Sequence, residues 1–204
     1  MRIWISSNFK KHYDTSIDFI EYTWINFFEI GKHEFLIIPN SVKNLKNFLI
    51  NEKKPTLIIL PGGNNLFGRD KLTKNRLKIE KELIKYSINK KIALLGVCRG
   101  MQVINNYFGG SIKKITGHMK VTSKIFFKEP FFNHKAIQVK CFHNFCIKSD
   151  LIPKELKIIA TDKKNNVEMF KHYKKKIIGV MWHPEREKNY HKLNIIINNL
   201  SKKK

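Results

Sequence analysis

The chain has 204 residues, 42% of them hydrophobic and 27% charged, with a formal net charge of +24. This length supports one substantial core, so we expect a single domain spanning residues 1–204. No apolar run approaches the roughly 18 to 20 residues of a transmembrane helix, so we expect no integral membrane protein. The cysteines, Cys98, Cys141 and Cys146, are too few for a disulfide framework. With no secretory signal pattern at the start, we expect a cytoplasmic protein.

The positive charge comes mostly from lysines spread along the whole chain. Excess Lys and Arg raises affinity for polyphosphates. Here the lysines accompany abundant Asn and Ile, as happens when a genome's base composition favours such codons. No helix-turn-helix, zinc-finger spacing or aromatic RNA-binding signature is present. We therefore expect a solvated basic surface and neither nucleic acid nor membrane as a partner, with a preference for anionic small molecules as the alternative.

Short apolar runs alternate with longer helical patterns in the first half of the chain, which is typical of an α/β domain with a largely parallel sheet. Strands are predicted at residues 2–6, 34–39, 56–60 and 92–97. One helix is predicted to start at a cap formed by Asp14 or Thr15, a second at Ser41, and a third runs from Asp70 to Lys90.

After Gly110 the pattern changes to strands that leave little room for helices. The predicted strands are residues 111–115, 120–127, 136–143, 156–161, 167–173 and 176–183. They extend the sheet or form a smaller antiparallel layer. A final helix is predicted from Lys188 to Leu200, and we find no internal repeat and no long linker.

A cysteine stands where an apolar strand passes directly into a helical pattern, in the segment LLGVCRGMQ at 94–102. Such a junction lies at the carboxyl edge of the sheet, where ligands bind in open α/β folds. The helix that begins near Arg99 favours thiolate through its free N–H groups and dipole. Gly96 and Gly100 leave space for a tight nucleophile elbow. We therefore predict Cys98 to be a nucleophile; the alternative is an ordinary buried cysteine.

A histidine and a glutamate lie at the end of the last predicted strand and just beyond it, in the segment GVMWHPER at 179–186. In an extended segment residues i and i+2 lie on the same side, so His183 and Glu185 can face the same way, with Pro184 fixing the bend. We expect Cys98, His183 and Glu185 to act as nucleophile, general base and acid, and orienting carboxylate. Taken alone, His183 would be a structural histidine.

With these motifs the chain resembles the class I glutamine amidotransferase superfamily. The nucleophile motif of that family, G-x-C-x-G-x-Q, is matched by GVCRGMQ, and its H-P-E motif lies at 183–185. LPGGNN at 60–65 falls where the family places its oxyanion loop, and VKCFHNF at 139–145 where it places a substrate-binding strand. The resemblance covers most of the chain and implies a flavodoxin-like α/β fold, with a mostly parallel central sheet flanked by helices and a small antiparallel extension.

The resemblance also implies an oxyanion hole formed by Gly63 and the backbone N–H of Arg99, which would stabilise a tetrahedral intermediate. PGGNN replaces the more frequent glycine-glycine-proline pattern, so the donor stays open among Gly62, Gly63 and Asn64. Without the family, the two glycines could form an ordinary turn.

Binding of the α-amino and α-carboxylate groups of a γ-glutamyl unit would fall, by the same resemblance, to Gly62, Gln102, His143, Asn144 and Phe145. Without the family, Gln102 could be a merely polar helix residue and His143 a strand residue facing solvent. Cys141 and Cys146 are expected to be bystanders, because no His or Cys spacing completes a metal site. We expect no cofactor and no metal.

The arginine in CRG, where many glutaminase subunits carry leucine, resembles the γ-glutamyl hydrolase (peptidase C26-like) branch, which cleaves γ-glutamyl amides. EYTWINFFEIG at 21–31, followed by LIIPN at 36–40, is similar to a bacterial subgroup of capsule phosphoramidate synthesis, the γ-glutamyl-CDP-amidate hydrolases. The resemblance implies a stand-alone hydrolase for a small γ-glutamyl substrate with an anionic leaving group. Arg69 and Arg186, a few residues beyond the site motifs, could meet a phosphate.

Three other functions stay open. The chain could be a glutaminase subunit that supplies ammonia to a separate synthetase partner. It could be a non-catalytic protein that binds polyanions. A third option is another use of the same elbow, as in related cysteine peptidases or chaperone-like proteins, which the placement of H-P-E disfavours. A homo-oligomer is the alternative to a synthetase partner.

Overall fold

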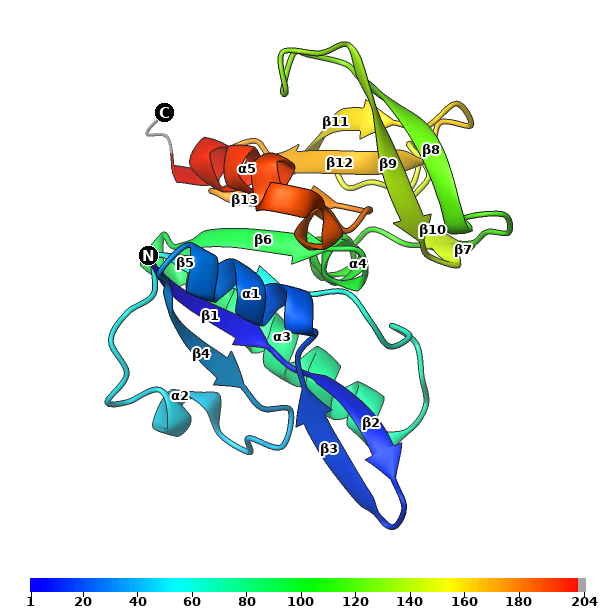
Figure 1. Ribbon diagram of the computed structural model, residues 1–204. Coiled ribbons are helices and arrows are strands. Elements are labelled where there is room, and N and C mark those ends of the chain that lie inside the picture. The colour runs from blue at the N-terminus through cyan, green and yellow to red at the C-terminus, as the bar shows by residue number, and fades with distance from the viewer. Residues whose placement is uncertain (202–204) are drawn as a thin grey trace.

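One long sheet runs through the part of the chain that the computed structural model describes, residues 1–201 (Figure 1). Its parallel half contains, in spatial order, β4 (Glu34–Ile38), β1 (Arg2–Ser6), β5 (Leu57–Leu60), β6 (Ala93–Val97) and β13 (Ile177–Val180). The antiparallel half continues with β12 (Val167–His172), β11 (Leu156–Thr161), β8 (Met119–Phe127) and β9 (Ala136–Phe142). The predicted α/β class with helices flanking the sheet is confirmed, and the antiparallel extension is joined edge to edge to the parallel strands.

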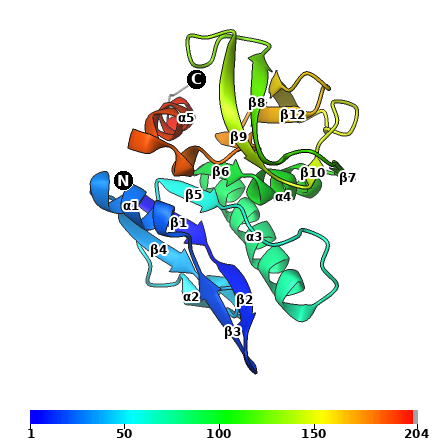
Figure 2. The same ribbon diagram turned by 45° about the vertical axis from the view of Figure 1, so that its right-hand side comes forward.

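Helices cover both faces of the parallel half (Figures 1 and 2). α1 (Tyr22–Ile30) and α5 (His191–Ser201) pack on one face, whereas α2 (Leu45–Phe48), α3 (Lys71–Lys90) and α4 (Arg99–Tyr107) pack on the other. Successive side chains of a strand point to opposite faces. In β1, Ile3 and Ile5 therefore join the core beneath α1 and α5, whereas Trp4 joins the core beneath α3 and α4.

The predicted long helix and the buried strands on either side of it form as the sequence indicates. β5 and β6 are buried at every position, as expected of parallel strands covered on both faces. Asp70 caps α3 by accepting a hydrogen bond from the Thr73 N–H at 3.0 Å. None of the helices in residues 1–201 is long and apolar enough to cross a membrane.

The predicted start of the first helix, at Asp14 or Thr15, is wrong. These residues belong to an antiparallel hairpin, β2 (Asn8–His12) and β3 (Thr15–Phe19), and α1 begins only at Tyr22. Thr15, Ile17 and Phe19 alternate along one strand, so their spacing fits a strand as well as a helix. The Asp18 carboxylate accepts from the Asn40 backbone N–H at 2.8 Å and from its side-chain amide at 2.7 Å, which fixes β3 against the body.

Other predicted boundaries shift at turns. The helix expected from Ser41 is only α2, capped by the Asn44 side chain. The strand expected at 111–115 shortens to β7 (Lys113–Lys114), which pairs with β10 (Phe145–Cys146) in a separate small sheet. At the end of the chain, 3-10 turns η1 (Pro184–Arg186) and η2 (Lys188–Tyr190) precede α5, which begins at His191 because Asn189 has a non-helical φ of 62°.

The N-terminus of α4 lies unusually close to the sheet. A Cβ atom on Gly100 would lie 1.9 Å from the Leu60 carbonyl oxygen, and one on Gly96 would lie 2.7 Å from the Gly100 carbonyl oxygen. Only glycine permits this contact between β5, β6 and α4.

Replacing Gly100 with alanine should therefore push α4 away from β5. We expect the free energy of unfolding to fall by about 1–3 kcal/mol, as for overpacking of a core. Thermal or urea unfolding measures the change, with Asn106→Ala in the same helix as the matched control. A Gly100→Ala protein as stable as that control would contradict the close approach.

Candidate active site

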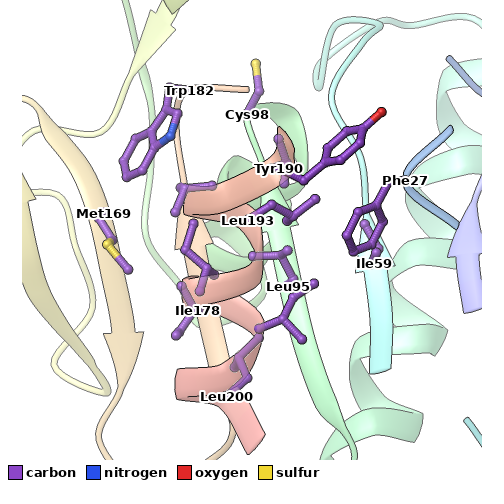
Figure 3. Close-up of a cluster of buried hydrophobic side chains, with 14 of the residues drawn as sticks. Phe27, Ile59, Leu95, Cys98, Met169, Ile178, Trp182, Tyr190, Leu193 and Leu200 are labelled. Atoms are coloured by element: carbon purple, nitrogen blue, oxygen red, sulfur yellow. The ribbon is translucent and has the colours of Figure 1, made fainter. Parts of the chain in front are cut away.

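Cys98 occupies a strained turn between β6 and α4. Its φ of 49° and ψ of −104° are rarely adopted by residues with side chains, and such conformations cost on the order of 1–3 kcal/mol. The surrounding structure holds the turn, because the Cys98 N–H donates to the Val180 carbonyl at 2.7 Å and the Cys98 carbonyl accepts from the Gln102 N–H at 3.2 Å. Figure 3 shows the Cys98 sulfur at the end of the hydrophobic cluster, directed away from Leu193. The predicted elbow is therefore present.

The imidazole of His183 connects Cys98 to Glu185. His183 Nδ1 lies 2.6 Å from Glu185 Oε1, and the ring and the Cys98 side chain both lie against Gly62. His183 and Glu185 are buried, with 5% and 1% of their surfaces exposed. Strand β13 ends at Val180, so the two side chains meet through the 3-10 turn η1 and not through an extended strand as the sequence suggested.

The charge state of His183 follows from these contacts. Burial opposes the protonated ring, but hydrogen bonds to Cys98 and Glu185 and the negative charges of both groups raise the pKa of His183 to about 10. The imidazole is therefore protonated at neutral pH.

The loop after β5, residues 61–64, lies directly over the cysteine and histidine. A Cβ atom on Gly62 would lie 2.5 Å from His183 Cε1 and 3.4 Å from Cys98 Cβ. Gly63 has a φ of 86°, and a Cβ atom there would lie 2.6 Å from Asn8 Oδ1. Glycine at 62 thus lets the backbone approach Cys98 and His183 closely, and glycine at 63 permits the positive φ and the close contact with Asn8.

Arg76 on α3 fixes the direction of this loop. Its guanidinium donates to the Pro61 and Gly62 carbonyls at 3.1 Å each and to the Gly63 carbonyl at 3.2 Å. The described residues contain no cis peptide bond, and in a trans peptide the N–H points opposite to the preceding carbonyl. Because the Gly62 carbonyl faces Arg76, the N–H of Gly63 points away from Arg76.

A buried ion network joins this arginine to the residue that follows Cys98. Glu80 accepts from Arg76 Nε at 3.0 Å and also pairs with Arg99 Nη1. Burial and the charge of Arg99 lower the pKa of Arg76 to about 10. Burial opposes ionisation of Glu80, but Arg99 and Arg76 outweigh it and lower the pKa of that carboxyl. Arg76 and Glu80 are therefore ionised at neutral pH, and with the guanidinium of Arg99 the network carries one net positive charge beside the site.

A cavity of about 340 Å³ opens in front of the cysteine. Its lining residues are Gly63, Asn64, Asn65, Cys98, Arg99, Gln102, Met119, Phe142, His143, Asn144 and Phe145. Cys98 thus shares one cavity with most of the residues that the family resemblance singled out. The solvent-facing alternative for His143 is wrong, because only 3% of the residue is exposed. Gln102 is likewise buried and donates from Nε2 to the Met181 sulfur at 3.7 Å.

The two arginines suggested for phosphate binding differ in position. Arg69 is exposed and lies outside this cavity. Arg186 lies at the edge of the site, with its guanidinium 5.0 Å from the centre of the Phe142 ring. It is already paired with Glu21 through hydrogen bonds of 2.6 and 3.0 Å.

Sequence reasoning missed the residues that position the loop, above all Arg76 and Glu80, and the lining residues Asn65, Met119 and Phe142. A signal for the pair was present. Arg76 and Glu80 stand at i and i+4 on the same face of the predicted helix as Ile79 and Leu83, so two opposite charges interrupt an apolar stripe.

Changing Glu185 to Gln should lower the pKa of His183, because the variant removes a negative charge that stabilises the imidazolium. In the unmodified protein the ring should stay protonated up to about pH 10. The stability that this proton contributes is complete below the unfolded pKa of about 6.5 and is lost as the pH rises toward 10. An NMR titration of the His183 ring measures the shift, with Glu187→Gln as the matched control. Equal titration curves for Glu185→Gln and the control would refute this account.

Known proteins share sequence and fold with this chain. The profile of the family described as glutamine amidotransferase class-I matches residues 17–203. The chain is similar to a γ-glutamyl-CDP-amidate hydrolase of Campylobacter jejuni, with 36% identity over 141 residues, which are 68% of this chain and 66% of that relative, just under two thirds. It is also similar to a glutamine-hydrolyzing GMP synthase subunit of Methanosphaera stadtmanae, with 30% identity over 74% of this chain and 78% of the relative.

Solved structures share the fold. A putative GMP synthase subunit from Thermoplasma acidophilum superposes with a TM-score of 0.71 at 21% identity, covering 98% of this chain and 92% of that one. A glutamine amidotransferase from Thermotoga maritima superposes with a TM-score of 0.68 at 18% identity, covering 95% and 80%. The family match extends over nearly all of the sequence, and the chain therefore belongs to the class I glutamine amidotransferase family.

Proposed function

We propose that the protein is a cysteine-dependent hydrolase that cleaves the C–N bond of a γ-glutamyl amide and releases glutamate. One observation carries this proposal: Cys98 lies in a strained elbow beside a cavity, next to a protonated His183 that is held by Glu185. A nucleophile, a proton carrier and an orienting carboxylate in this order form the catalytic triad of acyl transfer. Family membership supports the same chemistry.

The first half of the reaction forms an acyl-enzyme. The Cys98 thiolate attacks the γ-carbonyl carbon, and the carbonyl π electrons move onto its oxygen. The N–H groups of Gly63 and Arg99 stabilise that oxyanion, a contribution worth about 3 kcal/mol for each donor. When the intermediate collapses the C–N bond breaks, and His183 gives its proton to the departing nitrogen. A γ-glutamyl thioester remains on Cys98.

The second half returns the enzyme to its starting state. His183, now neutral, takes a proton from a water molecule as that water attacks the thioester carbon. Collapse of the second tetrahedral intermediate breaks the C–S bond and releases glutamate. Cys98 leaves as thiolate, and His183 again carries its proton. Glu185 keeps the imidazole oriented in both halves through its contact with Nδ1.

The γ-glutamyl group is expected to occupy the cavity in front of Cys98. Gln102 and the segment His143, Asn144 and Phe145 line that cavity and supply polar atoms for its α-amino and α-carboxylate groups. The volume of about 340 Å³ suits a small-molecule ligand.

We further propose that the leaving group is a nucleotide phosphoramidate, as in γ-glutamyl-CDP-amidate. The similarity to the hydrolase of that name supports this choice. The net charge of +24 would also favour approach of an anionic nucleotide.

A second candidate is a glutaminase subunit that supplies ammonia to a separate synthetase. The similarity to the glutamine-hydrolyzing GMP synthase subunit supports this function. Such a protein would be nearly inactive alone on every γ-glutamyl compound, whereas Cys98 would still react with an electrophilic analogue of glutamine.

Replacing Cys98 with alanine should abolish glutamate release and leave the fold intact, because the chemistry needs the sulfur. The assay compares glutamine, simple γ-glutamyl amides and γ-glutamyl-CDP-amidate, with Cys146→Ala as the matched cysteine control. We expect the nucleotide conjugate to turn over much faster than glutamine. Substantial activity in Cys98→Ala would sink the hydrolase proposal, and equal, weak turnover of all substrates would favour the glutaminase subunit.

Replacing Arg76 with lysine keeps a positive charge but removes the planar set of donors that holds three loop carbonyls. We expect kcat to fall by roughly 10²–10³-fold, the loss typical of one oxyanion donor, with little change in KM. Steady-state kinetics measure this split, and Arg69→Lys serves as the matched control on the surface. An Arg76→Lys enzyme with the kcat of the control would show that the loop does not depend on Arg76.

A further inference from the structure

A second cluster of reactive side chains lies behind the proposed catalytic cavity. It comprises Cys141 on β9, His143 just after that strand, and Glu168 on β12; Figure 1 shows β9 crossing in front of β12. One donor atom from each residue lies within 4.8 Å of the donor atoms of the other two. All three residues are buried, with 0%, 3% and 0% of their surfaces exposed.

The protonation of His143 is fixed by its neighbours. Nδ1 lies 2.9 Å from the Phe145 carbonyl oxygen, which can only accept a hydrogen bond, so Nδ1 carries the proton. Burial lowers the pKa of His143 to about 4, and the ring is therefore neutral at physiological pH. Nε2 consequently presents a bare lone pair. Metal-bound histidines show the same arrangement, with one nitrogen donating to a carbonyl and the other free to coordinate.

This lone pair faces the Glu168 carboxyl group. Nε2 lies 3.9 Å from Glu168 Oε1, too far for a hydrogen bond. Within residues 1–201, His143 Nε2 and both oxygens of Glu168 lack a hydrogen-bond partner. Three buried polar atoms without a partner in one place are rare in folded proteins and call for an explanation such as a bound ion.

The neighbouring His118 and Asp162 side chains do not supply partners to these atoms, because they bond to other groups. His118, whose ring lies 5.1 Å from that of His143, contacts the Thr116 carbonyl through Nδ1 at 3.3 Å and Asp162 through Nε2 at 3.2 Å. Asp162 also accepts from the Asn166 side chain at 2.6 Å. Among the buried side-chain atoms of residues 1–201, Asn166 Oδ1 also lacks a hydrogen-bond partner, but an amide oxygen is a weaker metal ligand than His143 Nε2 or the Glu168 carboxylate.

We propose that Cys141 Sγ, His143 Nε2 and the Glu168 carboxylate bind one divalent transition-metal ion, with Zn²⁺ as the best fit. A sulfur, an imidazole nitrogen and a carboxylate oxygen are ligands of zinc, whereas calcium and magnesium prefer sets of oxygens. Zinc–ligand distances of about 2.0–2.3 Å place neighbouring ligands roughly 3.3–3.7 Å apart, so the cluster needs only a small contraction. Three protein ligands leave a fourth position for water.

Metal binding would replace the proton of the thiol: the S–H bond breaks, the S–metal bond forms and H⁺ is released. Burial and the nearby Glu168 and Asp162 raise the pKa of Cys141 to about 12 in the metal-free state. Burial likewise raises the pKa of Glu168 to about 8, so this carboxyl group also releases its proton to the solvent when it coordinates at neutral pH. Because His143 also lines the cavity of Cys98, the ion would hold the segment at 143–145 in place.

The test is a Co²⁺ titration of the full chain carrying Cys98→Ser, which removes the other thiol beside the cavity. We expect one Co²⁺ per chain and a thiolate-to-cobalt charge-transfer absorption that added Zn²⁺ abolishes. Adding Cys141→Ser should remove this absorption, whereas the matched control Cys146→Ser should retain it. Far-UV circular dichroism checks that each variant is folded.

Glu168→Gln provides a second test that does not remove a cysteine. Its side chain has the shape of a protonated glutamate but is a poor ligand, so we expect at least about tenfold weaker Co²⁺ binding. The proposal is overturned if the Cys98→Ser protein shows no charge-transfer absorption, if this absorption survives Cys141→Ser, or if Glu168→Gln binds Co²⁺ with unchanged affinity. None of these readouts depends on hydrolase activity.

Discussion

The position of the site depends on one buried carboxylate, Glu80, shared by two arginines. Arg76 extends from it to three successive carbonyls of the loop over the cysteine, and Arg99 is the residue that follows Cys98. The loop and the elbow are therefore held to the same point of α3. Removing one member of a buried ion network leaves an uncompensated charge, which typically costs about 3–5 kcal/mol. A single substitution in this network is therefore more destabilising than replacement of all three residues together by apolar ones.

This arrangement also sets the electrostatics around the sulfur. Two arginines and one glutamate leave a net positive charge near Cys98, and the protonated His183, which is paired with Glu185, supplies a second cation next to this residue. Fixed charges and N–H groups stabilise an anion without having to reorient when it forms. This arrangement lowers the stability of the folded state, because the backbone of Cys98 is strained and the guanidinium of Arg76 is buried.

The sequence predicted those parts of the site that depend on neighbours along the chain. The elbow follows from a strand, a cysteine and a glycine in succession, and His183 and Glu185 are only two residues apart, although a 3-10 turn joins them. Contacts between segments far apart in the chain could not be predicted, because no local sequence pattern indicates them. The side chains of Ser6 and Glu80 form a hydrogen bond although the two residues are 74 positions apart in the sequence. Glu168 lies next to Cys141 and His143 although it belongs to another strand. The hairpin before α1 was misread because its alternating residues fit two periods equally well.

Strand β13 marks a division within the sheet, parallel to β6 on one side and antiparallel to β12 on the other. The elbow and the loop over it follow parallel strands, whereas the segment 143–145 follows a strand of the antiparallel half. The lining of the cavity thus comes from both halves of the sheet. Met119 on β8 and Phe142 on β9 belong to this lining, so substitutions in the antiparallel half would change the shape of the cavity while the strained cysteine and its charged support stay unaltered.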